Sequence, residues 1–230
     1  MVLLLEEMGY HVCPGLFFAT VVLGALPTLM EDTEEQKKDF LPKIASGERL
    51  LTLALTDLHT RWIPTSPRVS AFFDGREYVI DATKLFVPYA HAADHFLLVA
   101  RTQESRDPWE GLMIFVVDAR TPRITLTRLE NLQNDKQFEA VFDQIFVSPE
   151  NIVGGLDKGG PIVIDVLAKA AVARGAEMVG GAQAAMDMAM KFAGERVQYK
   201  CQALSVRCGS SGSWAQCHTA TIQIVFSFRR

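Results

Sequence analysis

The fold is decided by two short stretches, Leu53-Ala-Leu-Thr-Asp57 and Thr83-Lys-Leu-Phe-Val-Pro-Tyr-Ala90. Each has the apolar run that is typical of a buried strand. The first ends on two hydrogen-bonding side chains, Thr56 and Asp57, and the second is closed by a proline, Pro88. A strand that ends in polar groups, beside one that ends in bulky apolar groups, makes a wall suited to a flat ligand. The pattern therefore predicts a binding site at these strand ends.

Around these stretches, residues 50–150 have the hydrophobic period of strands. Asp74-Gly75 is typical of a hairpin turn. Short strands at regular spacing, separated by turns rich in Pro, Gly and Asp, favour an antiparallel barrel or sandwich over parallel strands with crossover helices. The predicted strands are 50–57, 68–73, 76–81, 84–89, 95–101, 111–118, 123–129 and 136–147.

The flanking segments are predicted to be helical. Thr33-Glu-Glu-Gln36 is a capping box that starts a helix ending at Gly47. Gly159-Gly-Pro161 opens a long helix to about Tyr199, with the proline in its first turn. Each glycine inside that helix costs about 1 kcal/mol relative to alanine, which indicates the close approach of another backbone. So much small apolar surface on one helix predicts oligomerisation, a truncated chain, or both.

Together these patterns predict an α+β fold in four parts. Residues 1–49 form an incomplete N-terminal helical part, and residues 50–150 form a central antiparallel β-barrel or sandwich domain. Residues 151–200 begin a C-terminal helical domain with one long helix. Residues 201–230 are rich in Gly and Ser at first and then alternate like an isolated strand, so we interpret them as a divergent or frame-disturbed tail.

Composition excludes several classes of protein. The 230 residues have a formal net charge of −4 and a pI of about 5.8, which gives no electrostatic case for a nucleic-acid partner. The first residues lack the basic region of a signal peptide. The apolar stretch 15–30 is too short for a membrane span and contains Pro27. The four cysteines show no CxxC pair, so we expect reduced thiols and a bacterial cytoplasmic or mitochondrial-matrix-like location.

Residues 2–200 resemble the acyl-CoA dehydrogenases. The likeness rests on the order and spacing of several short motifs, which are Thr33-Glu-Glu-Gln-Lys-Lys-Asp-Phe-Leu-Pro-Lys-Ile-Ala-Ser-Gly-Glu48, Leu53-Ala-Leu-Thr-Asp57, Thr83-Lys84, Val99-Ala-Arg-Thr102, Val147-Ser-Pro-Glu-Asn151, Val179-Gly-Gly-Ala-Gln183 and Glu195-Arg-Val-Gln-Tyr199. The resemblance implies an FAD-dependent oxidoreductase of β-oxidation or steroid breakdown. Such an enzyme desaturates an acyl-CoA at Cα–Cβ, passes hydride to FAD, forms homo- or hetero-oligomers, and uses an electron-transfer flavoprotein as acceptor.

The resemblance also implies roles for particular residues. Thr56 matches the family's threonine at the isoalloxazine edge, and Phe86, Val87 and Pro88 match its segment beside the flavin ring. Arg196 matches the arginine that reaches the FAD pyrophosphate of a partner subunit, a task suited to a planar guanidinium.

The chain departs from the family pattern at several positions. Pro88 stands where the family has a hydroxyl donor to the flavin. The alternative catalytic Glu used by some members falls at about Ala170, and the usual one belongs to helices that the sequence does not show, so we assign no catalytic residue. Asp57 runs into Leu58-His59 in place of the family's Gly- and Ser-containing loop. Asp57 and His59 remain candidates for the substrate side.

Other residues have simpler interpretations. Glu177 could act as a base, but an ion pair with Arg174 three residues earlier is the favoured interpretation. His91 and His95 are interpreted as loop or edge histidines, and no metal site is predicted. At the level of the whole chain, two alternatives remain open. The chain could be a non-catalytic subunit of a heteromeric dehydrogenase, or a binding module whose flavin site has decayed.

Overall fold

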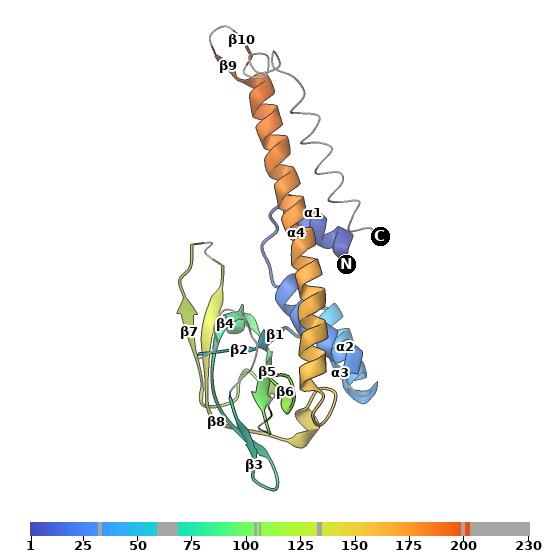
Figure 1. The fold of residues 1–230 in the computed structure, drawn as a ribbon, viewed down its shortest axis with the longest axis vertical. Helices are drawn as coiled ribbons and strands as arrows, with labels where there is room; N and C mark the ends of the chain where they lie inside the picture. The colour runs from blue at the N-terminus through green and yellow to red at the C-terminus, as the bar shows by residue number, and fades with distance from the viewer. Residues whose placement is uncertain are drawn as a thin grey trace. The chain divides into compact units, whose positions relative to one another are not determined.

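The structure is a computed structural model that describes residues 1–31, 34–58, 69–103, 105, 107–132, 135–198 and 201–202 (Figure 1). The chain divides into two compact units. One is formed by residues 15–170. The other is formed by residues 1–14 together with the chain from residue 171 onward.

The unit of residues 15–170 is built on two β-sheets. The larger has the strand order β2-β4-β8-β7, with β3 also paired to β4. Its two long strands, β4 (Tyr78–Pro88) and β8 (Gln137–Val147), run antiparallel and curve along one another (Figure 1). The smaller sheet has the order β1-β5-β6. The remaining strands are β1 (Leu51–Ala54), β2 (Thr56–Asp57), β3 (Ala71–Phe73), β5 (His95–Arg101), β6 (Leu112–Asp118) and β7 (Ile124–Leu129).

The predicted α+β class and the positions of most strands are confirmed, with three corrections. The predicted strand 50–57 is two strands, because the chain leaves the smaller sheet after Ala54 and joins the larger one at Thr56. The predicted strands 76–81 and 84–89 are one strand, β4. The β1–β5 pairing is parallel, and the sheets do not close into a barrel. A sequence pattern gives the period of a strand but not its partner, which explains these differences.

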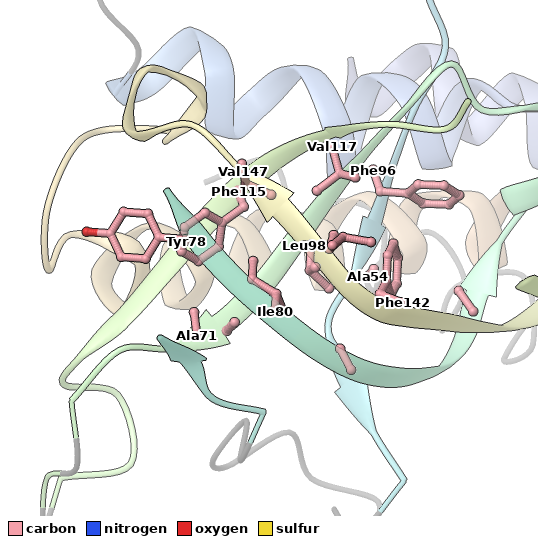
Figure 2. Packing of buried hydrophobic residues seen from close by; sticks show 14 of the residues in the cluster. Ala54, Ala71, Tyr78, Ile80, Phe96, Leu98, Phe115, Val117, Phe142 and Val147 are labelled. Carbon is pink, nitrogen blue, oxygen red and sulfur yellow. The ribbon is translucent and has the colours of Figure 1, made fainter. Parts of the chain in front are cut away.

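The core of this unit lies between the two sheets. Figure 2 shows apolar side chains of the two sheets pointing toward one another. Phe96 of β5 meets Phe142 of β8 edge to face, with ring centroids 5.4 Å apart, and both rings are fully buried. Aromatic pairs favour this geometry because the positive edge of one ring faces the negative face of the other. The pair therefore joins the two sheets at the centre of the core.

Helices cover the other face of the smaller sheet. They are a π-helix at Phe18–Ala25, α2 (Leu26–Glu31), α3 (Glu34–Ala45) and the first turns of α4 (Gly159–Glu195). α3 ends before Gly47, which has φ +78°, as predicted. Thr33 of the predicted capping box lies outside the described residues. The Gln36 side chain donates to the carbonyl oxygens of Glu150 (3.1 Å) and Ile152 (3.4 Å). Gln36 therefore fastens α3 to the segment after β8.

The second unit contains α1 (Val2–Tyr10) and the part of α4 (Gly159–Glu195) from residue 171. Glycine lets these two helices touch. A Cβ added at Gly180 would lie 1.8 Å from the Glu6 carbonyl oxygen, and one added at Gly9 would lie 2.0 Å from that of Glu177. The close approach predicted from the interior glycines is confirmed at Gly180. At Gly175, by contrast, no other part of the described chain lies within 4 Å of an added Cβ, so the described residues show no such approach there.

Side chains of α4 form ion pairs and hydrogen bonds with one another and with α1. Arg174 pairs with Glu177 at 2.6 Å, so the simpler interpretation of Glu177 is confirmed. Lys169 likewise pairs with Asp165. Asp187 accepts hydrogen bonds from the Tyr10 hydroxyl at 3.0 Å and from Gln183 at 2.8 Å. After α4 come β9 (Val197–Gln198) and β10 (Cys201–Gln202). None of the helices in the described ranges is long and apolar enough to cross a membrane.

Candidate functional site

The predicted wall forms where β2 pairs with β4. Thr56 lies opposite Leu85, and Asp57 lies opposite Lys84. Residues that face one another in an antiparallel pair point to the same side of the sheet, and neighbours along a strand point to opposite sides. Asp57 and Lys84 are buried, whereas Thr56 and Leu85 are half-exposed. The two pairs therefore occupy opposite faces, with Thr56 and Leu85 on the outer one.

A β-bulge brings Phe86 to the face of Thr56. Between Lys84 and Val87, β4 advances three residues while β8 advances only two, from Ala140 to Phe138. The extra residue interrupts the alternation, so that Lys84 and Val87 both point into the core. Leu85 and Phe86 consequently lie on the outer side in succession, and Phe86 is 53% exposed. Thr56, Leu85 and Phe86 form one surface, which we name the outer wall.

The backbone of the outer wall is strained. Phe86 has φ +56°, and Tyr89, just beyond the strand, has φ +51°. The left-handed region costs a residue with a side chain roughly 1–2 kcal/mol. Conformations of this kind cluster at ligand-binding and catalytic sites, where the surrounding structure holds them in place. Their presence at the strand end supports a binding role for the outer wall.

Behind the outer wall lies a buried ion pair between Lys84 and Asp57, whose side chains are 0% and 4% exposed. The Lys84 ammonium also donates to the Leu55 carbonyl oxygen at 3.1 Å. The second carboxylate oxygen of Asp57 accepts the Val69 backbone N–H at 3.2 Å. Burial lowers the pKa of Lys84 below its ordinary value, and the Asp57 carboxylate acts in the opposite direction. The Asp57 carboxylate thus lies on the buried side and is engaged there.

The other predicted site residues are not among the three that form the outer wall. The Val87 side chain packs in the core. Pro88 follows Val87 and is half-buried, so by the same alternation it faces the outer side of the sheet, and its carbonyl oxygen accepts a hydrogen bond from the Thr52 hydroxyl at 2.6 Å. Arg196 belongs to the second unit, where its guanidinium lies 5.1 Å from the centre of the Phe192 ring. His59 lies outside the described residues.

No group of side chains suited to a metal ion occurs in the part of the chain that the structure describes. His91 lies in a short 3₁₀ turn and stacks on Phe138 with ring centroids 4.9 Å apart, and His95 begins β5. His91 therefore agrees with the predicted loop position. The prediction is wrong for His95, because β5 is the central strand of the smaller sheet and not an edge. A shallow hollow beside the β3–β4 hairpin shares no residue with the outer wall. It is lined by Ala71, Phe73, Tyr78, Thr102, Gln103, Met113, Leu156 and Asp157.

Comparison with known proteins places this arrangement in a family. Residues 52–145, which contain the outer wall and nearly all of both sheets, match the acyl-CoA dehydrogenase middle domain. An acyl-CoA dehydrogenase of Bacillus subtilis is 30% identical over 180 residues, which are 77% of this chain and 47% of that protein. The chain belongs to the acyl-CoA dehydrogenase family.

Further acyl-CoA dehydrogenases agree in sequence and fold. The cyclohex-1-ene-1-carbonyl-CoA dehydrogenase of Geobacter metallireducens is 30% identical over 203 residues, covering 86% of this chain and 53% of that protein. The solved structure of butyryl-CoA dehydrogenase from Megasphaera elsdenii has a TM-score of 0.83 at 23% identity, covering 99% of this chain and 59% of that one. The chain spans about half the length of the curated acyl-CoA dehydrogenases it matches.

Sequence reasoning missed Lys84 as a residue of the candidate site. A signal for it exists, because Ile80, Ala82 and Lys84 alternate on one side of β4, and the first two are obvious core residues. A lysine in that position must be buried, and a buried ammonium requires a carboxylate partner. Asp57, at the end of the neighbouring apolar strand, is the acid that the sequence offers.

Proposed function

We propose that the chain contributes the β domain of an FAD-dependent acyl-CoA dehydrogenase, and that its outer wall contacts the flavin ring. Family membership supports the class of enzyme. A solved structure of a glutaryl-CoA dehydrogenase of Mycobacterium smegmatis is described as a complex with FADH2. It has a TM-score of 0.78 to this chain at 18% identity, covering 92% of this chain and 53% of that one. The observation that carries the proposal is the β-bulge, because it turns Phe86 to the same side as Thr56.

The chemistry of the outer wall suits a flat ring with a polar edge. Leu85 and Phe86 offer an apolar and an aromatic surface on which a ring can lie. The Thr56 hydroxyl can donate or accept a hydrogen bond. β2 is the terminal strand of its sheet, so one edge of its backbone has no strand partner among the described residues. Pro88 supplies no N–H and no side-chain donor. Bound flavin would accept hydride from the acyl Cβ.

Several finer parts of the function are proposals of the same kind. The substrate would be an acyl-CoA, as the names of the relatives say of those proteins. Arg196 would offer its guanidinium fork to the FAD pyrophosphate of another subunit. Oligomerisation is supported by exposed apolar side chains on α4, which include Val172, Met178, Met188 and Phe192. An electron-transfer flavoprotein would take the electrons. Asp57 is better placed to support the outer wall from behind than to contact substrate.

A titration with FAD tests the proposal. We expect the purified chain to bind FAD, and Phe86→Asn to weaken that binding about tenfold, because it removes the aromatic surface. Asparagine tolerates the left-handed conformation, so the backbone is kept. The measurement is the flavin absorbance and fluorescence change on binding.

The matched control is Phe72→Asn, which removes an exposed phenylalanine from β3 in the same sheet. We expect it to leave FAD affinity unchanged. A wild-type chain that stays colourless in excess FAD contradicts the proposed function, and equal losses in the two variants contradict the assignment of the outer wall.

A further inference from the structure

The buried pair behind the outer wall is held by more contacts than an isolated ion pair. Lys84 reaches across from β4 and donates to both neighbours of Thr56 in the chain, the Leu55 carbonyl oxygen and the Asp57 carboxylate. Thr56 is thereby fixed on either side by a single ammonium. The same ammonium belongs to the residue immediately before Leu85 and Phe86. One side chain thus connects all three residues of the outer wall.

The strand that carries Thr56 needs such a connection. β2 consists of only two residues, and its ladder with β4 consists of the two pairs Thr56–Leu85 and Asp57–Lys84. Such a short edge strand is weakly specified, and a slip of one residue would turn Thr56 to the other face. Asp57 opposes a slip, because it holds both Lys84 and the Val69 backbone N–H.

Stability alone does not explain why a lysine and an aspartate occupy these two buried positions. Burying two charges requires removing both from water, and an apolar pair of similar volume is often as stable or more stable. A buried ion pair does, however, specify a register, because its partners must meet in one geometry, and such a role is well attested for buried polar groups. This pair lies directly behind the outer wall, so the register that it specifies determines which side chains form the outer wall.

We propose that Lys84, acting through Asp57 and the Leu55 carbonyl, is a positioning residue that sets the outer wall in the geometry required for flavin. The inference rests on the proposed function, since it presumes that the outer wall contacts FAD. It extends that function to two residues that do not touch the ligand. In the absence of the pair, β2 keeps its hydrophobic environment and loses its fixed register.

The test is a double variant, Asp57→Leu with Lys84→Met, which replaces the pair by apolar side chains of similar volume. We expect the thermal midpoint to stay close to that of wild type and the dissociation constant for FAD to rise at least about tenfold. The circular dichroism of bound flavin at saturation should also change, because the ring meets a different surface. The matched control is Val147→Ala, a buried residue at the opposite end of the β4–β8 ladder. It should lower the midpoint and leave both flavin readouts unchanged.

The outcomes separate the two proposals. If wild type binds FAD and the double variant binds it equally well with the same flavin spectrum, the positioning role is wrong and the proposed function stands. If wild type does not bind FAD, the proposed function fails first. Should the double variant not fold, Asp57→Asn replaces it, because this change keeps the shape of the side chain and removes its charge. We then expect at least about a threefold rise in the dissociation constant, and an unchanged constant contradicts the positioning role.

Discussion

Asp57→Ala is expected to lower the free energy of unfolding by about 3–5 kcal/mol, because it leaves the Lys84 ammonium buried without its counter-charge. Lys84 is fully buried, and of its two described partners the variant keeps only the neutral Leu55 carbonyl oxygen. The loss is measured by chemical denaturation at neutral pH. The matched control is Asp81→Ala, which removes an exposed carboxylate from β4, the strand of Lys84, and should change the free energy of unfolding by less than about 0.5 kcal/mol.

The pH dependence of Asp57→Ala follows from the pKa of Lys84. Burial already holds this pKa below the ordinary value of 10.5, and the variant loses the carboxylate that raises it. Below the lowered pKa both the folded and the unfolded chain bind the proton, so the full cost of burying the charge is present. Above it the folded chain releases the proton first, so the unfolded chain binds more protons and stability rises with pH. The variant should therefore regain stability between the lowered pKa and 10.5, and a flat profile in that range contradicts this account.

Phe142→Ala is expected to cost about 3–5 kcal/mol of the free energy of unfolding, since it opens a cavity between the two sheets and removes the edge-to-face contact with Phe96. Phe142 is fully buried at the centre of the core, in contact with the other sheet (Figure 2). Denaturant unfolding measures the loss. Phe146→Ala, four residues further along the same strand, is the control, because Phe146 is 56% exposed. A loss of similar size in both variants would mean that burial of Phe142 does not hold the sheets together.

Local features of the fold could be predicted because they depend on neighbouring residues. A few adjacent residues determine each of three such features, which are the Asp74-Gly75 turn, the end of α3 before Gly47 and the Arg174–Glu177 pair. Features that depend on distant partners could not be predicted. The parallel pairing of β1 with β5 and the transfer of the chain from one sheet to the other at Leu55 leave no mark on the hydrophobic period.

The same distinction between local and long-range features applies to the candidate site. The resemblance and the strand pattern together pointed to Thr56 and Phe86, and the structure brings these two to one face. The β-bulge was not predictable, because phenylalanine, which occupies position 86, is not one of the residue types that favour a positive φ. Its consequence is that Leu85 joins the outer wall while Val87 turns into the core. The side of the sheet on which Asp57 lies depends on its pairing with Lys84, which only the register reveals.

The central claim is that the outer wall meets the flavin ring, and contact quenching of tryptophan fluorescence tests it most directly. Phe86→Trp places an indole on the outer wall, and Phe72→Trp places one on β3 in the same sheet. Each variant is titrated with FAD, and the emission of wild type, which contains three tryptophans, is subtracted. We predict that FAD extinguishes most of the emission added by Phe86→Trp and leaves that added by Phe72→Trp largely unchanged. Equal quenching in the two variants, or none in either while FAD is bound, would contradict the claim.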